Sequence, residues 1–380
     1  MTTQNMKFGS SICVWLLLIS SAAFAQPVPP DGPSSATGPI SGYMDFHFNK
    51  GEAEDGVLDF HRFVLIVNHS FSPRIRFVAE LELEHAFVEG LEERGELELE
   101  QAYVDFLLRR SFNVRAGMLL VPMGIINERH EPPVYMGVER PFVDTVIIPS
   151  TWFENGAGMF GEVGRGFRYR AYVMAPLNAL EFSADEGIRN GRQKGSRSDV
   201  RNVAYTGRVE WVGVPGLTLG ASAWSGKSSF LAPRLDVQVR VGEADVRYKR
   251  NRLELRGEFA QVWIDDAERL NLTAGQLTGV SPNIARELRG FYAEGAYRVW
   301  QRGPGRDLVG FARYENFDTQ FRMPSGYIPL KQFDRDAWIA GAAYYPDPDI
   351  AVKVDYVWQR SLSTVIIAPN GFNIGIGWWF

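Results

Sequence analysis

The segment 122–155 holds the densest mixture of side chains that could act on a charged solute. These side chains are Glu128, Arg129, His130, Glu131, Glu139, Arg140 and Asp144. Carboxylates, guanidinium groups and an imidazole held at close quarters create a local electric field, and rings or walls of such charge select ions in pores. For each residue a second interpretation stays open, in which the side chain pairs with a neighbour and only braces the segment.

The same segment has the composition of an ordered loop. Five prolines limit its backbone freedom: Pro122, Pro132, Pro133, Pro141 and Pro149. Two short apolar runs, 134–136 and 146–148, could pack against a wall. Connectors of this length are usually functional or disordered, and the prolines and apolar runs disfavour disorder.

Further charges recur on segments of alternating polarity. The phase of the alternation places arginines on the polar face at Arg76, Arg115, Arg168, Arg170, Arg208, Arg240, Arg247 and Arg256. Opposing them is an acidic hairpin with Glu80, Glu82, Glu84, Glu92, Glu93, Glu96, Glu98 and Glu100. Arginine keeps its charge and holds anions with a planar fork of donors. The acidic hairpin could balance the arginines, attract cations or bind divalent ions near lipopolysaccharide, and we favour charge balance.

Catalytic and metal-binding patterns are weak. The five histidines (His47, His61, His69, His85 and His130) show no metal-ligand spacing along the chain, and no Gly-x-Ser-x-Gly motif occurs. We therefore predict no catalytic residues, no metal and no cofactor. A Ser–His pair could still assemble from separate strands, since such sites are spatial, and His85 or His130 would then be the base of a hydrolase.

The elements that position these charges are predicted strands. Alternating polarity recurs in sixteen segments: 39–48, 57–70, 74–88, 95–108, 112–121, 156–163, 167–176, 203–213, 216–226, 234–249, 251–264, 288–300, 307–317, 336–346, 349–361 and 370–380. Most reach the nine to eleven residues that a membrane-crossing strand needs. The alternation slips near Glu100–Gln101 and near Gly242–Glu243, where we expect β-bulges.

The connectors between these segments alternate between tight and mostly longer ones, such as 122–155, 177–202, 265–287 and 318–335. That pattern is typical of an up-and-down transmembrane barrel with short periplasmic turns and long external loops. We predict an all-β fold: a 16-stranded antiparallel barrel with both termini in the periplasm and an inward-folded third external loop, 122–155. The alternative is a soluble periplasmic β-sandwich.

The two ends of the sequence fit this prediction. The final segment alternates Phe372, Ile374, Ile376, Trp378 and Phe380 with small or polar residues, as a lipid-facing strand requires. Trp378 and Phe380 resemble the signal by which barrel-assembly machinery recognises outer-membrane proteins. Residues 1–25 have a secretory signal pattern, residues 26–38 form a flexible leader, and the barrel spans 39–380.

Composition narrows the partners. The formal net charge is −5, and it becomes −6 if Lys7 leaves with the signal. This balance argues against a nucleic-acid partner. The only cysteine, Cys13, lies within the signal, so the mature chain is expected to hold no disulfide.

A family resemblance rests on residues 100–106 (Glu-Gln-Ala-Tyr-Val-Asp-Phe), 114–117, Pro122–Gly124, 139–142 and 156–161. These stretches resemble the phosphate-selective porin O and P group. The resemblance implies a sixteen-stranded channel, often a homotrimer, with anion preference in the best-known members. It departs in one respect: those members line the pore with a lysine cluster, whereas this chain has seven lysines and none in 51–193.

We therefore predict an outer-membrane porin that lets small hydrophilic solutes diffuse passively, with 122–155 as its constriction. Its expected partners are outer-membrane lipid, lipopolysaccharide and the barrel-assembly machinery. The alternatives are a barrel hydrolase and a closed structural or adhesive barrel.

Overall fold

The computed structural model describes residues 38–85, 95–230, 235–302 and 306–380. The predicted signal and nearly all of the leader lie outside these residues, as do Glu92 and Glu93 of the acidic hairpin.

Sixteen strands correspond one to one with the predicted segments. They are β1 (Ile40–Gly51), β2 (Val57–Ser72), β3 (Ile75–Glu84), β4 (Glu96–Arg109), β5 (Phe112–Leu120), β6 (Phe153–Val163), β7 (Phe167–Met174), β8 (Ala204–Val214), β9 (Leu217–Phe230), β10 (Leu235–Arg250), β11 (Leu253–Ile264), β12 (Glu287–Gln301), β13 (Asp307–Arg322), β14 (Asp334–Asp347), β15 (Ile350–Ser361) and β16 (Gly371–Trp379). The largest boundary difference is at β13, which continues five residues beyond its predicted end.

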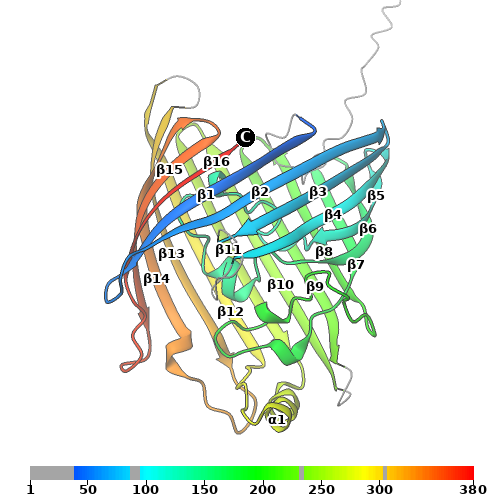
Figure 1. Ribbon diagram of the computed structural model, residues 1–380, viewed down its shortest axis with the longest axis vertical. Coiled ribbons are helices and arrows are strands. Elements are labelled where there is room, and N and C mark those ends of the chain that lie inside the picture. The colour runs from blue at the N-terminus through cyan, green and yellow to red at the C-terminus, as the bar shows by residue number, and fades with distance from the viewer. Residues whose placement is uncertain (1–37, 86–94, 231–234, 303–305) are drawn as a thin grey trace, which may run out of the picture.

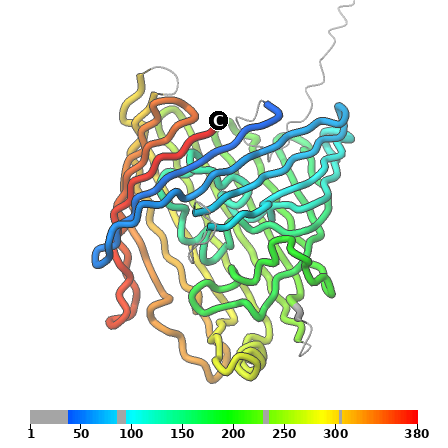
Figure 2. Tube along the Cα trace, in the orientation of Figure 1, coloured from blue at the N-terminus to red at the C-terminus, as the bar shows by residue number. Residues whose placement is uncertain are grey.

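The strands form one closed antiparallel barrel in which each strand pairs with its sequence neighbours and β1 closes the ring against β16 (Figure 1). Tyr43 faces Trp379 in the closing register, and the backbones of Gly42 and Phe380 exchange two hydrogen bonds of 2.9 Å. The predicted 16-stranded antiparallel all-β barrel is confirmed. The Cα trace in Figure 2 shows the C-terminus at one rim and the longer connectors at the other.

The two faces of the wall have opposite chemistry. On β16, Phe372, Ile374 and Ile376 face outward and are exposed, as the alternation predicts, and Phe380 directly after the strand is exposed as well. Charged residues on the inward face are buried, for example Glu80 on β3 and Arg208 on β8, among many others. An apolar outer face and a polar inner face are what a membrane-spanning barrel requires.

One predicted bulge is confirmed and the other is wrong. The register between β3 and β4 shifts so that Glu80 pairs with Gln101 and Leu81 with Leu99, which leaves Glu100 as the extra residue. Around Gly242 and Glu243 the register is continuous with both neighbouring strands. The break in the polarity pattern has another cause. Along β10 the inward residues are apolar up to Val241 and charged from Glu243 onward.

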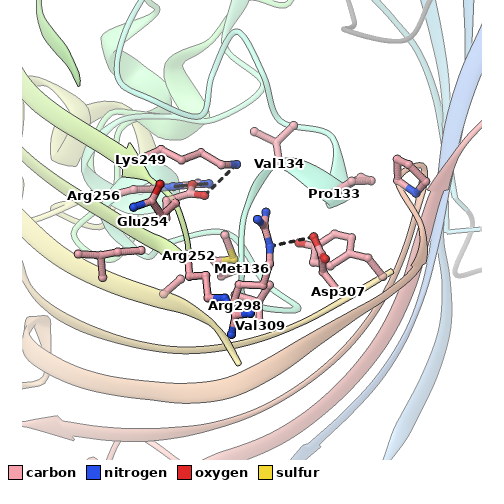
Figure 3. Close-up of a pocket in the computed structure, with 15 residues that line it drawn as sticks. Pro133, Val134, Met136, Lys249, Arg252, Glu254, Arg256, Arg298, Asp307 and Val309 are labelled. Atoms are coloured by element: carbon pink, nitrogen blue, oxygen red, sulfur yellow. Dashed lines mark hydrogen bonds and ion pairs between the residues drawn. The ribbon is translucent and has the colours of Figure 1, made fainter. Parts of the chain in front are cut away.

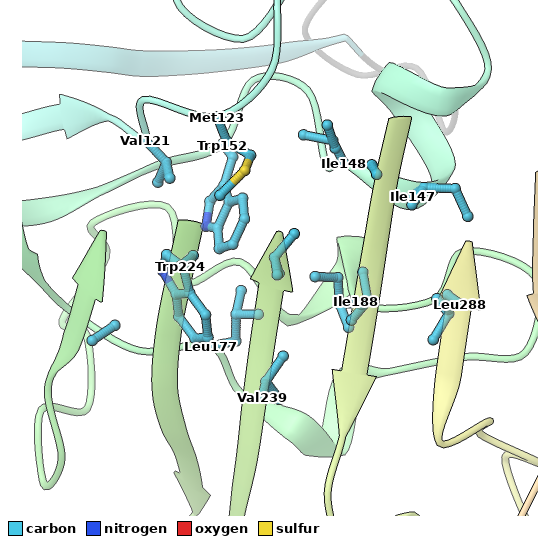
Figure 4. Packing of buried hydrophobic residues seen from close by; sticks show 14 of the residues in the cluster. Val121, Met123, Ile147, Ile148, Trp152, Leu177, Ile188, Trp224, Val239 and Leu288 are labelled. Atoms are coloured by element: carbon cyan, nitrogen blue, oxygen red, sulfur yellow. The ribbon is translucent and has the colours of Figure 1, made fainter. Parts of the chain in front are cut away.

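The cause is an apolar core inside the barrel (Figure 4). Inward residues of β10, such as Val239, pack with side chains from the connectors, including Trp152, Leu177 and Ile188. Trp152 also lies against Trp224 of β9, with ring centroids 5.4 Å apart. The inner face is therefore not polar along every strand, because the connectors after β5, β7 and β11 supply a hydrophobic filling in this region.

Short helices lie in the connectors. They are η1 (Pro132–Val134), η2 (Val143–Ile147), η3 (Ala179–Glu181), η4 (Arg189–Gly191), η5 (Lys331–Phe333) and α1 (Ala267–Thr278). The helix α1 was not predicted; it lies in the connector between β11 and β12, at the rim opposite the C-terminus (Figure 1). In the part of the chain that the structure describes, no helix has the length and apolar character to cross a membrane.

Candidate functional site

Residues 121–152, here called the β5–β6 connector, are bonded to inward-facing residues of distant strands. Lys353 on β15 donates hydrogen bonds to the carbonyl oxygens of Pro132, Tyr135 and Gly137, at 2.5–2.7 Å. The backbone amide of Val138 donates to Asp355, at 2.6 Å. Hydrogen bonds of this kind, to charged partners and away from water, are among the stronger ones in proteins. They fix the middle of the connector, residues 132–138, against β15.

The connector is also bonded, before and after residues 132–138, to strands β11 and β13. The amide of Val143 donates to Glu315 of β13 (3.1 Å), and the amide of Ile125 donates to Glu258 of β11 (3.3 Å). The connector thus contacts inward side chains of β11, β13 and β15, and η1 also packs against β1 and β16.

Four of the predicted connector residues line cavities or bridge to the wall. Glu128 pairs with Arg170 on β7 at 3.1 Å. Arg129 lines two cavities, and Arg140 donates to the carbonyl oxygen of His130 at 3.2 Å. Glu139 accepts a hydrogen bond from Asn49 (2.8 Å) and lies 3.1 Å from His47. Although burial raises the pKa of the Glu139 carboxyl, its contacts with His47 and Asn49 lower it to about 2.

The other three, His130, Glu131 and Asp144, are buried. Neither carboxylate oxygen of Asp144 has a hydrogen-bond partner among the described residues. Burial, together with the carboxylates of Glu315 and Glu243, raises the pKa of Asp144 well above its ordinary value. Burial thus favours the neutral form of Asp144, and the residue belongs to the packed part of the connector.

Seven of the eight predicted arginines face inward, and all seven are paired with carboxylates. Arg76 and Arg115 both bind Asp105 (2.8 and 2.7 Å). Arg208 binds Asp245 at 2.5 Å and Glu243 at 3.1 Å. The remaining pairs are Arg168 with Glu162 (3.0 Å), Arg170 with Glu210 (3.2 Å), Arg247 with Glu210 (2.5 Å) and Arg256 with Glu254 (2.5 Å).

The prediction for Arg240 is wrong. Its neighbours Val239 and Val241 are buried on the inner face of β10, so Arg240 points outward, where it pairs with Asp265 at 2.6 Å. The prediction assumed that the polar face of each strand points into the barrel. On this part of β10 the apolar face points inward, because it packs against the apolar core.

The acidic residues predicted on β3 also face inward. Glu80 accepts a hydrogen bond from Gln101, Glu82 lies 3.4 Å from Arg62, and Glu84 lies 3.6 Å from the same arginine. Charge balance by Arg62 fits the interpretation favoured from the sequence for Glu82 and Glu84.

Three adjoining cavities of about 390, 370 and 100 Å³ lie along one side of the connector. Figure 3 shows the first, between Pro133, Val134 and Met136 of the connector and the side chains of Lys249, Arg252, Arg256 and Arg298. Nine cationic side chains and four carboxylates line the three cavities: Arg129, Arg168, Arg170, Arg208, Arg247, Lys249, Arg252, Arg256 and Arg298 against Glu128, Glu210, Glu254 and Asp307. Cations therefore dominate this lining.

A fourth cavity, of about 180 Å³, touches a later part of the connector. Its lining includes Glu139, Arg140, Arg313, Asp355 and Asn373. Residues 133–136 thus line one cavity and residues 139–142 another, which places the connector between them.

Sequence reasoning missed how the histidines gather. Among the described residues, three groups of possible ligands form, and within each group the ligand atoms lie within 4.8 Å of one another. The groups are Asp45, His47 and His61; His61, Glu84 and His85; and Glu80, Glu100 and His130. Each group combines residues from two or three segments of the chain. Spacing along the sequence could not reveal them; only the strand register could.

Taken together, the closed ring, the apolar outer face and the charged inner face define a sixteen-stranded β-barrel of the outer-membrane type. Solved structures with this fold include OmpF of Salmonella typhi in complex with daunomycin (13% identity, TM-score 0.59, 90% of this chain and 97% of that chain). The outer membrane channel DcaP of Acinetobacter baumannii is similar to the same degree (13% identity, TM-score 0.58, 90% and 96%). OmpT, an outer membrane protein of Vibrio cholerae, also matches (10% identity, TM-score 0.56, 90% and 96%).

The chain belongs to the same family as an uncharacterized protein of Aquifex aeolicus (strain VF5). The two are 35% identical over 327 residues, which cover 84% of this chain and 74% of that protein. No protein-family model matches the chain.

Proposed function

We propose that this protein is an outer-membrane porin, a passive diffusion channel for small hydrophilic solutes. The observation that carries the proposal is the combination of a closed barrel with charged cavities inside it. Such a channel works by steric sieving and by the field of its inner wall. It uses no covalent chemistry and no coupled energy source.

We propose further that the β5–β6 connector is the constriction. Residues 133–136 of the connector line one cavity, and Glu139 and Arg140 line another. A solute that passes from one cavity to the other would have to move past residues 133–142. These residues are fixed by hydrogen bonds to β15, so the constriction would be rigid.

The excess of cationic side chains in the three adjoining cavities supports a preference for anions, because such a lining raises the local concentration of negative ions. The resemblance to the phosphate-selective porin O and P group fits an anion channel. The chain lacks the lysine cluster of that group, so we do not extend the proposal to phosphate. A homotrimer, and assembly through Trp378 and Phe380, remain proposals of the same kind.

The test is single-channel conductance of the refolded protein in a planar bilayer, with the reversal potential measured under a KCl gradient. Discrete steps and an anion-selective reversal potential are expected. The double variant Arg168→Gln/Arg247→Gln removes two inward charges and should shift the reversal potential toward cation selectivity. Arg240→Gln is the matched control, because it removes an arginine from the outer face and should leave the potential unchanged.

A barrel whose lumen is blocked, with a structural or adhesive role, is the second candidate, because the apolar core and the connector fill part of the interior. A folded, heat-modifiable barrel that gives no conductance steps would support it and would contradict the porin proposal. Hydrolase activity that depends on His85 or His130 would support the barrel-enzyme alternative.

A further inference from the structure

We propose that Glu80, Glu100 and His130 bind one divalent first-row transition-metal cation, of which Zn²⁺ is the type, and that this ion ties the β5–β6 connector to the barrel wall. The three side chains come from β3, β4 and the connector. Their ligand atoms lie within 4.8 Å of one another. The inference goes beyond the channel proposal and does not depend on it.

The strand register explains how two carboxylates meet here. Glu80 pairs with Gln101 across the β3–β4 ladder, and the bulge at Glu100 places both Glu100 and Gln101 on the inner face. In a regular strand, successive side chains would point to opposite faces. The side-chain amide of Gln101 donates a hydrogen bond to Glu80 and so orients its carboxylate.

His130 is oriented as a metal-binding histidine usually is. Its Nδ1 lies 3.0 Å from the carbonyl oxygen of Asn127, which can only accept, so Nδ1 carries the proton of that hydrogen bond. The other ring nitrogen, Nε2, lies 3.1 Å from Glu100 and 3.9 Å from Glu80. A backbone carbonyl that binds one ring nitrogen fixes the tautomer in which the other can coordinate a metal.

The charges around the site call for a cation. The side chains of Glu80, Glu100 and His130 are all at most 4% exposed. One carboxylate oxygen of Glu100, and one of the neighbouring Glu131, has no hydrogen-bond partner among the described residues. Buried carboxylates are costly unless they are paired or coordinate a metal. The imidazole of His130 lies within 4 Å of both glutamates but carries at most one positive charge, whereas one divalent ion balances both.

The other two groups of possible ligands fit a cation less well. In the group of Asp45, His47 and His61, the guanidinium of Arg62 lies 3.4 Å from Asp45 and 3.1 Å from His61. A metal ion there would stand beside a fixed positive charge. In the third group, His85 has a side chain that is 51% exposed, and it already pairs with Asp59.

The donor set indicates the class of ion. Imidazole suits Zn²⁺ and similar transition metals, whereas Mg²⁺ and Ca²⁺ prefer oxygen ligands only. Tetrahedral ligands about 2.1 Å from Zn²⁺ lie roughly 3.4 Å from each other. The distances of 3.1 and 3.9 Å from His130 to the two carboxylates bracket that value. Since His130 belongs to the connector, the ion would join it to β3 and β4.

The test is isothermal titration of ZnCl₂ into the refolded, EDTA-treated full chain, with MgCl₂ as a second titrant. We expect one Zn²⁺ per chain and no comparable Mg²⁺ binding. Glu100→Gln, which preserves shape and removes the charge, and His130→Ala should each weaken Zn²⁺ binding at least tenfold. Heat-modifiable gel mobility establishes that each variant is folded, and Glu100→Gln serves if His130→Ala does not fold.

His85→Ala is the matched control, since it removes a histidine of a rival group, and it should bind Zn²⁺ as the unmodified chain does. The proposal is overturned if the unmodified chain binds no Zn²⁺, or if folded Glu100→Gln binds it unchanged. It is equally overturned if binding is lost in His85→Ala or His47→Ala and kept in Glu100→Gln. Because the measurement is binding and not conductance, its outcome is separate from that of the channel test.

Discussion

The ammonium group of Lys353 lies 4.0 Å from the ring centre of Tyr135 and donates a 2.6 Å hydrogen bond to the carbonyl oxygen of that residue. Two more connector carbonyls accept from the same group. A strand residue thus holds the connector through three backbone carbonyls and one aromatic ring.

Lys353→Met should loosen the connector. Methionine keeps the length of the side chain but leaves three carbonyl oxygens without their donor, at a cost of about 3 kcal/mol. We expect faster trypsin cleavage after Arg129 and noisier open-channel current. Lys249→Met, at the exposed mouth of a cavity, is the control. Unchanged proteolysis and noise in Lys353→Met would show that Lys353 does not hold the connector.

Deletion of residues 131–144 should raise the conductance. The deletion removes η1 and lining residues of three of the four cavities, so a wider passage is expected if the connector narrows the channel. The measurement is single-channel conductance of the refolded variant, accepted only if the protein keeps its heat-modifiable mobility. Equal conductance in a folded variant would remove the constriction assignment.

Trp152→Ala should destabilise the interior of the barrel. Trp152 is fully buried against Trp224, and truncation of a buried tryptophan costs about 3–5 kcal/mol. The change should lower the urea midpoint of unfolding. Trp338→Ala is the matched control, because Trp338 lies on the outer face of β14. If the urea midpoint falls equally in both variants, the inner apolar core contributes no more to stability than the outer face does.

Acid should release the Glu139 contact. The pKa of Glu139 is lowered from 4.5 to about 2, so the folded state favours the ionised form. The stabilisation is then complete above pH 4.5 and is lost as the pH falls toward 2. Thermal unfolding of the unmodified chain should become easier over this range. In Glu139→Gln the loss of thermal stability over this pH range should be smaller. An identical dependence of the unfolding temperature on pH in the two proteins would contradict the role of Glu139.

Much of the fold could be predicted from the sequence because the period of a strand is local. The alternation of Ile374 and Ile376 with Asn373, Gly375 and Gly377 defines both faces of β16 without knowledge of any other strand. The alternation of tight and long connectors then orders the strands around the ring. Even the bulge at Glu100 was visible as a local break in polarity.

The candidate sites could be predicted only in part. The residues that line the cavities, such as Arg168 and Arg170, follow from their phase on a strand. The outward direction of Arg240 does not, because it depends on the apolar side chains that the connectors bring to the inside of β10. The sequence gives the two faces of a strand but not what fills the space beside them.

The sequence by itself determined a sixteen-stranded barrel with a charged inner face, since both follow from periodicity within each segment. Only the tertiary structure decided that Glu80, Glu100 and His130 meet, because they lie on separate segments joined by strand register and by the path of the connector. Contacts between residues 20 to 50 positions apart depend on how the whole ring closes, and no local pattern encodes them.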